Sequence, residues 1–340
     1  MKFTQASGAW LLIVVTGTVL ALSTTATAGS DPGRIAFNFG SDLYSIKPDG
    51  SDLKQLTDLG SQNIVAFWES WSFDGSQLVF VEFPPDGPSQ LWLMNADGSN
   101  PHQVFDDGNF QDYAPSFAPD GSHLIFTRCQ PNWPAFTTSC AIYSVNPDGS
   151  GLAAITHFSP AVNEWEANYS PDGKSISFEA FELGGFLAAV YVMNPDGTNR
   201  HRITKPAPCA VDANWSPDSN KIAVWTVECS FGADEIWTMN ADGTGIKHLT
   251  SNKLPIEAVN PSWSPDGNFI TYERDNLAKG TSAIVVVGAD SKGERQILEI
   301  PASARSAQRY RITGRWRSAA GLRPREIEQG GSFPKWGAVK

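Results

Sequence analysis

The chain has 340 residues, of which 41% are hydrophobic and 18% are charged, and its formal net charge is −11. An acidic chain repels nucleic acid and anionic lipid, so those two classes of partner are excluded and cationic or basic partners are favoured. The length allows one large β domain or two ordinary domains with a sizeable core.

Residues 1–28 have the three parts of a secretory signal peptide. Lys2 gives a positive start, Ala9–Leu22 is an apolar run, and Ala26–Ala28 is a small-residue cleavage site. An uncleaved anchor is the alternative, but the apolar run is shorter than the roughly 20 residues that a spanning helix needs. We therefore expect a mature chain that begins near Gly29, is periplasmic or secreted, and has no transmembrane span.

Two short motifs that contain Asp-Gly alternate along the rest of the chain. The first reads WSFDG, FAPDG, YSPDG, WSPDS and WSPDG, beginning at Trp71, Phe117, Tyr169, Trp215 and Trp263. The second has its aspartates at Asp49, Asp97, Asp148, Asp196, Asp242 and Asp290, so successive copies are 46 to 51 residues apart. A period of this length indicates a repeat architecture.

Each period contains four short runs of β-forming residues separated by turn signals. In the fifth period these runs are Asp212–Trp215, Lys221–Val227, Glu235–Met239 and Gly245–Leu249, here called strands a to d. A four-stranded antiparallel unit that cannot cover both of its faces alone is a propeller blade when it is repeated around a ring. The sequence predicts an all-β, six-bladed propeller within residues 29–300, with blades near 34–57, 66–105, 114–156, 166–204, 212–250 and 260–299.

The first predicted blade lacks strand a. The sequence FPKWGA, from Phe333 to Ala338, aligns with NPSWSP, which begins at Asn260. We therefore expect residues 333–340 to supply the missing strand and close the ring, because an open ring would expose two sheet edges.

Residues 301–332 have no place in the repeat. They are basic and rich in Arg, Gly and Ser, which predicts a loop or disordered excursion. Trp316, in GRWRS, is an alternative closing residue. Trp336 is favoured over it because a proline precedes Trp336 at the same offset as one precedes Trp263.

These motifs carry a family resemblance. The alternation of P-x-W-S-P-D-G with I-Y-V-M-N-x-D-G, and the endings Arg202–Thr204 and His248–Thr250, resemble the propeller repeat of TolB and its WD-repeat-like relatives. TolB is the periplasmic component of the Tol-Pal system. The resemblance covers residues 34–300 and 333–338 and implies a six-bladed propeller, here expected without the α/β domain that precedes it in TolB.

The Asp-Gly motifs are interpreted as turns and not as ion sites. In S-P-D-G, Pro presets φ, Asp can hydrogen-bond the backbone, and Gly accepts a positive φ. The liganding positions of an EF-hand loop are missing from the copies. The aromatic residue that opens each copy is expected to pack between blades.

The a-to-b turns lie on one rim of the predicted ring, so the d-to-a and b-to-c loops share the opposite rim with a mouth of the channel. Spacing alone leaves three pairings for the four cysteines. The predicted blades place Cys129 with Cys140 and Cys209 with Cys229 on that second rim. We expect these two disulfides.

Acidic and aromatic residues are frequent in the loops of the same rim. They predict a ligand- or partner-binding face made of Trp68, Asp112, Trp133, Glu164, Trp165, Glu166, Asp212 and Glu257, with Glu69 as a weaker member. A divalent cation such as Ca²⁺ or Mn²⁺ has Asp112, Glu164, Asp212 and Glu257 as its candidate ligands. The alternative is that each acid is a solvated loop residue.

No nucleophile elbow, zinc-protease, P-loop or dinucleotide motif occurs, and no catalytic residue is predicted. The predicted function is that of a monomeric protein- or peptide-binding module or scaffold in the cell envelope, without a cofactor unless the cation binds. A metal-dependent lyase or hydrolase that acts on an extracellular sugar or peptide at the acidic channel mouth is the alternative.

Overall fold

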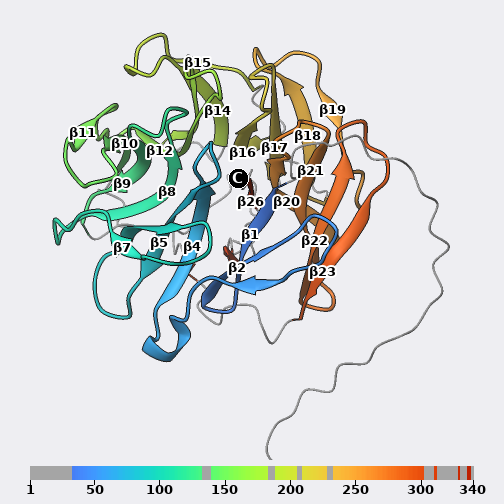
Figure 1. The fold of residues 1–340 in the computed structure, drawn as a ribbon. Helices are drawn as coiled ribbons and strands as arrows, with labels where there is room; N and C mark the ends of the chain where they lie inside the picture. The colour runs from blue at the N-terminus through green and yellow to red at the C-terminus, as the bar shows by residue number, and fades with distance from the viewer. Residues whose placement is uncertain are drawn as a thin grey trace, which may run out of the picture. The chain divides into compact units, whose positions relative to one another are not determined.

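The strands form six antiparallel sheets of four strands each, which are arranged as blades around a common axis (Figure 1). The computed structural model describes residues 33–131, 139–182, 188–204, 209–227, 233–301, 310–311, 328–329 and 335–337. The predicted all-β, six-bladed propeller is therefore confirmed.

The blades have the following strands in the order a to d. Blade 1 has β26 (Lys335–Gly337), β1 (Arg34–Phe39), β2 (Asp42–Ile46) and β3 (Lys54–Gln55). Blade 2 has β4 (Val65–Trp71), β5 (Gln77–Phe83), β6 (Gln90–Asn95) and β7 (His102–Gln103). Blade 3 has β8 (Gln111–Phe117), β9 (Leu124–Cys129), β10 (Cys140–Val145) and β11 (Ala153–Ala154).

The second half of the ring repeats this pattern. Blade 4 has β12 (Val162–Tyr169), β13 (Ile176–Glu182), β14 (Ala188–Met193) and β15 (His201–Arg202). Blade 5 has β16 (Cys209–Trp215), β17 (Lys221–Val227), β18 (Glu235–Asn240) and β19 (Lys247–His248). Blade 6 has β20 (Ile256–Trp263), β21 (Phe269–Asn276), β22 (Thr281–Gly288) and β23 (Arg295–Ile300), and a 3-10 helix lies at Gly60–Gln62.

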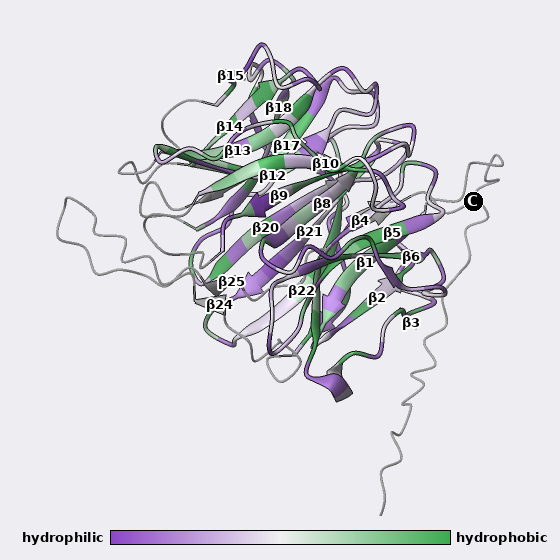
Figure 2. Ribbon diagram, turned by 90° about the vertical axis from the view of Figure 1, so that its left-hand side faces the viewer, coloured by the Kyte–Doolittle hydropathy of each residue, from purple (hydrophilic) through white to green (hydrophobic). Residues whose placement is uncertain are grey.

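The hydrophobic core lies between the blades. Each of the six interfaces has its own cluster of buried apolar side chains. Ala36 packs with Leu78 between blades 1 and 2, and Ile35 packs with Ile284 between blades 6 and 1. In Figure 2 the hydrophobic residues accordingly follow the strands, and most turns are hydrophilic. Because alternate residues of a strand point to opposite faces, each blade contributes apolar side chains to the interfaces with both of its neighbours.

The C-terminal strand closes the ring. β26 pairs with β1, with Lys335 opposite Ala36, Trp336 opposite Ile35 and Gly337 opposite Arg34. The indole N–H of Trp71, in blade 2, donates to the Lys335 carbonyl oxygen at 3.2 Å. A Cβ atom on Gly337 would lie 2.1 Å from Trp71 Cγ, so this approach requires glycine. The predicted closure by the last residues is confirmed, whereas Trp316 lies outside the described residues.

Every Asp-Gly motif is a turn closed by its own aspartate. In all eleven copies, Oδ1 of the aspartate accepts a hydrogen bond from the backbone N–H two residues further on. Ser219, which replaces glycine in one copy, adopts the positive φ of 60° that the turn requires. Hydrogen bonds from Ser51 hold the pKa of Asp49 below its usual value. The interpretation of these motifs as turns is confirmed.

The chain outside the blades is described only in part. Within the predicted excursion 301–332, β24 (Tyr310–Arg311) pairs with β25 (Glu328–Gln329). The rest of that segment, and the predicted signal peptide, lie outside the described residues. In the part of the chain that the structure describes, no helix is long and apolar enough to cross a membrane.

Candidate binding site in the channel

The inner strands β4, β8, β12, β16 and β20 carry a β-bulge at the same place. A non-glycine residue with positive φ begins each bulge: Trp68, Ala114, Glu166, Asp212 and Asn260, with φ between 46° and 55°. A bulge changes the direction of the side chains that follow it. The first four of these residues line the narrow part of the channel.

The channel contains two adjoining cavities. The narrow one, here called the waist, has a volume of about 50 Å³ and is lined by Trp68, Glu69, Ser70, Ala114, Pro115, Glu166, Asn168, Asp212, Asn214 and Lys335. The wider one, here called the funnel, has a volume of about 250 Å³. Ser70, Asn168, Asn214 and Lys335 line both cavities.

The funnel opens on the rim of the a-to-b turns. Its walls include the turn residues Phe73, Pro171, Pro217 and Pro265, together with Trp71, Tyr169, Trp215 and Trp263. The predicted binding face is on the opposite rim, but the wider cavity opens here. The aromatic residues also pack between blades as expected, since Trp215 donates its indole N–H to the Asn168 carbonyl oxygen at 3.3 Å.

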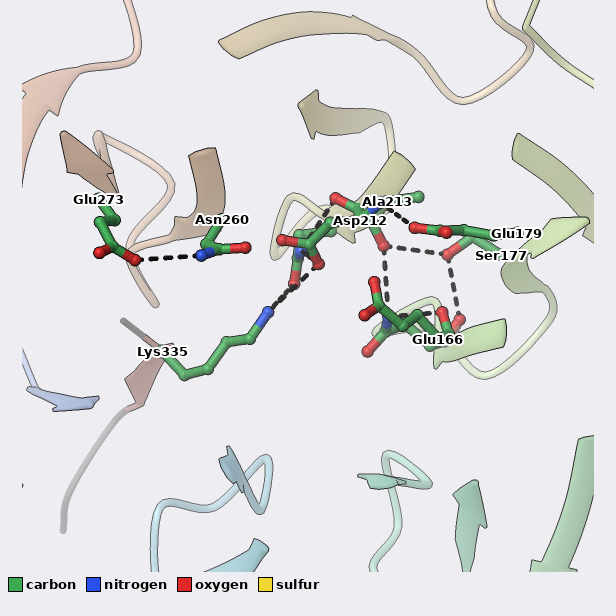
Figure 3. Close-up of polar contacts among 10 residues, drawn as sticks. Glu166, Ser177, Glu179, Asp212, Ala213, Asn260, Glu273 and Lys335 are labelled. Atoms are coloured by element: carbon green, nitrogen blue, oxygen red, sulfur yellow. Dashed lines mark hydrogen bonds and ion pairs between the residues drawn. The ribbon is translucent and has the colours of Figure 1, made fainter. Parts of the chain in front are cut away.

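Lys335 crosses the channel from blade 1 to blade 5 (Figure 3). Its Nζ atom lies 3.5 Å from Asp212 Oδ1 and 3.3 Å from Asn214 Oδ1. The side chains of Lys335 and Asp212 are 18% and 8% exposed, so the ion pair is largely shielded from water. The closing strand thus places a positive charge in an otherwise acidic waist.

Glu166, Glu179 and Asp212 form a network beside this lysine (Figure 3). Glu179 Oε1 accepts the backbone N–H of Asp212, and the carboxyl groups of Glu166 and Glu179 are hydrogen-bonded to each other. Desolvation, with the nearby Asp212 charge, raises the pKa of Glu166 to about 7. Burial and the Glu166 charge raise the pKa of Glu179 well above its usual value. A hydrogen bond between two carboxyl groups requires a proton, which Glu179 holds more tightly.

Glu69 faces the same cavity from blade 2. It is 1% exposed, and neither carboxylate oxygen accepts a hydrogen bond from another residue within the described part of the chain. Burial raises the pKa of Glu69 to about 8, although a hydrogen bond from its own backbone N–H and the charge of Lys335 act in the opposite direction. A buried acid that no other residue hydrogen-bonds is costly. Glu69 is therefore the side chain of the waist whose bonding is least complete.

Two of the predicted acids are neutralised by arginines of their own blades. Asp112 Oδ1 and Oδ2 each accept a hydrogen bond from Arg128 at 2.8 Å. Burial raises the pKa of Asp112 to about 6, and Arg128 opposes that shift. Glu164 accepts a hydrogen bond from Arg200. Neither acid is among the residues that line the waist or the funnel.

The remaining predicted residues are divided between the channel and its surroundings. Trp68 lines the waist, and its ring contacts Tyr113 at 5.4 Å between centroids, which in turn contacts Trp165 at 5.2 Å. Glu257 is half-buried at the start of β20 and is not part of either cavity lining. Trp133 lies outside the described residues. Of the predicted face, the waist thus brings together Trp68, Glu166 and Asp212, and Glu69 joins them.

The predicted cation site is not assembled by these positions. Asp112 and Glu164 point to their arginines, and the structure, over its described residues, holds no group of three or more His, Cys, Asp or Glu side chains arranged to bind a metal ion. Cation binding at the channel mouth stays a prediction.

Sequence reasoning missed three residues of the site: Lys335, Glu179 and Asn214. Lys335 occupies the position at which the other inner strands have Ser70, Ser116, Asn168, Asn214 and Ser262. The alignment of the closing strand therefore indicated this residue. At a position where the other inner strands have serine or asparagine, a lysine adds the single positive charge. Glu179 lies on strand b, where the equivalent positions hold Val81, Thr127, Trp225 and Glu273, so no constant residue type marks it.

One of the two predicted disulfides is confirmed. Cys129 and Cys140 are bonded and lie directly opposite each other on β9 and β10, with a Cα to Cα distance of 4.1 Å. The bond joins strands b and c of blade 3 at the rim of the b-to-c loops. The pair Cys209 and Cys229 lies outside the part whose side chains are described.

Comparison with known proteins defines the family. A family model described as the TolB beta propeller domain matches residues 70–310, which is more than half of the chain. The chain belongs to the TolB β-propeller family. The matched region begins in β4, so blade 1 and its closing strand are assigned to this TolB-type propeller by the structure.

Solved structures have the same architecture. TolB from Acinetobacter baumannii is 19% identical with a TM-score of 0.66, over 92% of this chain and 68% of that one. A putative TolB from Agrobacterium tumefaciens is 16% identical with a TM-score of 0.61, over 78% and 89%. A chain of a nidogen/laminin complex is 11% identical with a TM-score of 0.59, over 79% and 93%. At these identities the similarity shows the fold alone.

Proposed function

We propose that this chain is an exported TolB-like propeller that binds a protein or peptide partner at the channel of its ring, as a module of the cell envelope. The observation that carries the proposal is the continuous recess formed by the funnel and the waist. Its lining includes residues from all six blades, with apolar walls above an acidic floor. A concave, pre-formed recess with a few polar groups at its base is the usual form of a binding site.

The rigidity of the ring supports this proposal. The blades are fixed by six buried interfaces and by a paired closing strand, so the recess keeps its shape without a ligand. A pre-organised site loses little conformational entropy on binding. Residues 1–28 act as the signal peptide in this proposal, and the mature protein is a monomer in the periplasm or outside the cell.

A pull-down from an envelope fraction tests the proposal. Ser70 lines both cavities, so Ser70→Trp fills the recess, whereas Ser251→Trp places the same side chain on an exposed loop residue. We expect the wild type and Ser251→Trp to retain the same protein and Ser70→Trp to lose it. Equal retention by all three, with Ser70→Trp shown to be folded by circular dichroism, would place the binding elsewhere.

The alternative is a metal-dependent lyase or hydrolase that acts on an extracellular sugar or peptide. Asp112 and Glu164 would have to leave Arg128 and Arg200 to bind a cation, which makes this function less well supported by the geometry. Thermal unfolding with and without Ca²⁺ or Mn²⁺ tests it. A rise in the melting temperature that Asp212→Asn removes would favour the enzyme.

A further inference from the structure

We propose that the waist of the channel binds one primary ammonium group, carried by a lysine side chain of the partner that enters through the funnel. The inference rests on the proposed function and names the chemistry of the bound group. Glu69 is the observation that points to a ligand, because this residue is 1% exposed and lines the waist, and its carboxylate accepts no hydrogen bond from another described residue.

The carboxyl groups that line the waist outnumber its basic groups. Glu69, Glu166 and Asp212 contribute three carboxyl groups, and Lys335 is the one basic residue among the described residues that line the waist. Lys335 is already engaged with Asp212 and Asn214 on blade 5. A second positive charge can be met by Glu69 on blade 2 and by Glu166 on blade 4, whose carboxyl group also shares a hydrogen bond with Glu179. Asp212 Oδ2, which has no hydrogen-bond partner among the described residues, is a third acceptor.

The arrangement of these acceptors suits an ammonium. They come from three different blades and therefore surround the cavity, whereas a guanidinium presents its donors in one plane and pairs best with a single carboxylate. An ammonium has three donors that can reach three separate acceptors. A volume of about 50 Å³ has room for a few water molecules, or for an ammonium and the methylene group next to it.

The funnel provides the path for a lysine stem. Its walls are Trp71, Trp215, Trp263 and the prolines Pro171, Pro217 and Pro265, which form apolar surface for four methylene groups. The aspartates of the a-to-b turns belong to the same rim, so basic partners are attracted to this opening.

Titration calorimetry of the full chain with Nα-acetyl-lysine N-methylamide tests the inference. We expect saturable binding that is at least tenfold tighter than that of the norleucine analogue, which has the same stem without the ammonium. Glu69→Gln is expected to weaken the lysine analogue about tenfold. Glu82→Gln is the matched control, because Glu82 is also buried and desolvated in blade 2 but does not line either cavity, and it should leave the affinity unchanged.

Three results would overturn the inference. They are equal binding of the lysine and norleucine analogues, unchanged affinity in Glu69→Gln, and saturation by CaCl₂ without any response to the lysine analogue. Asp212→Asn should also weaken the lysine analogue, and circular dichroism of both variants guards against a folding defect. If the envelope pull-down still succeeds while these titrations fail, the proposed function stands and the ammonium site does not.

Discussion

Replacement of Lys335 by methionine tests how the ring is closed. The change keeps the length of the side chain and the backbone pairing of β26 with β1, but it removes the charge that meets Asp212 across the channel. Asp212 is 5% exposed, so its carboxylate would be left in a desolvated site beside Glu166 and Glu69. We expect Lys335→Met to destabilise the fold.

The magnitude follows from the burial of the pair. Removal of one partner from a buried ion pair costs about 3 to 5 kcal/mol, because the other charge stays buried. The N to O distance of 3.5 Å and the 18% exposure of Lys335 place the cost for this pair at the lower end of that range, at about 3 kcal/mol. Lys335→Met/Asp212→Asn removes both charges and should recover most of that loss.

Urea unfolding followed by tryptophan fluorescence measures the effect, with the slope m expected to stay constant. Lys174→Met is the control, because Lys174 approaches Asp172 more closely, at 3.1 Å, but is 81% exposed. An exposed pair contributes little, so the control should unfold like the wild type. A loss below about 0.5 kcal/mol in Lys335→Met, or no recovery in the double variant, would refute a buried closing ion pair.

Three further predictions concern the waist, the closing strand and the disulfide. Burial raises the pKa of Glu69 to about 8, so the folded chain holds this proton more tightly than the unfolded chain and loses stability as the pH rises from about 4.5 to about 8. Glu69→Gln should therefore be more stable than the wild type at pH 8.5, by at most about 5 kcal/mol. Urea unfolding at several pH values measures this difference, and a parallel pH profile for both proteins would contradict it. Gly337→Ala should lower stability by about 1 to 3 kcal/mol because of the contact with Trp71, and an unchanged melting temperature would show that β26 is not held there. Cys129→Ser/Cys140→Ser should lower the free energy of unfolding by about 2 to 3 kcal/mol. The reduced wild type is the control, and it should unfold at the same urea concentration as the variant.

Much of the fold follows from the sequence because repeats reinforce one another. The two Asp-Gly motifs alternate with a constant period, and each copy needs the same turn chemistry, as the hydrogen bond from Asn268 to Asp266 illustrates. The closing strand was predictable from the offset of Pro334 to Trp336, since ring closure demands a strand that pairs with β1.

The site was less predictable because it depends on side-chain direction and on pairs that are distant in sequence. Asp112 and Glu164 are acids of inner strands, as Glu166 is. However, Asp112 pairs with an arginine 16 residues away, and Glu164 pairs with one 36 residues away, each within its own blade. The bulges then turn Glu166 and Asp212 into the channel, at a non-glycine positive φ that no residue type signals. The partner of Asp212 is Lys335, 123 residues away.

Site-specific photo-crosslinking tests most directly whether the funnel is the binding face. Phe73 at the funnel and Leu152 on a c-to-d turn are both 40% exposed, so a photoreactive benzoyl-phenylalanine at either position is equally accessible. In the envelope, position 73 is expected to give a discrete adduct that Ser70→Trp abolishes, and position 152 is expected to give none. An adduct from position 152 alone, or one from position 73 that persists with Ser70→Trp, would contradict binding at the channel.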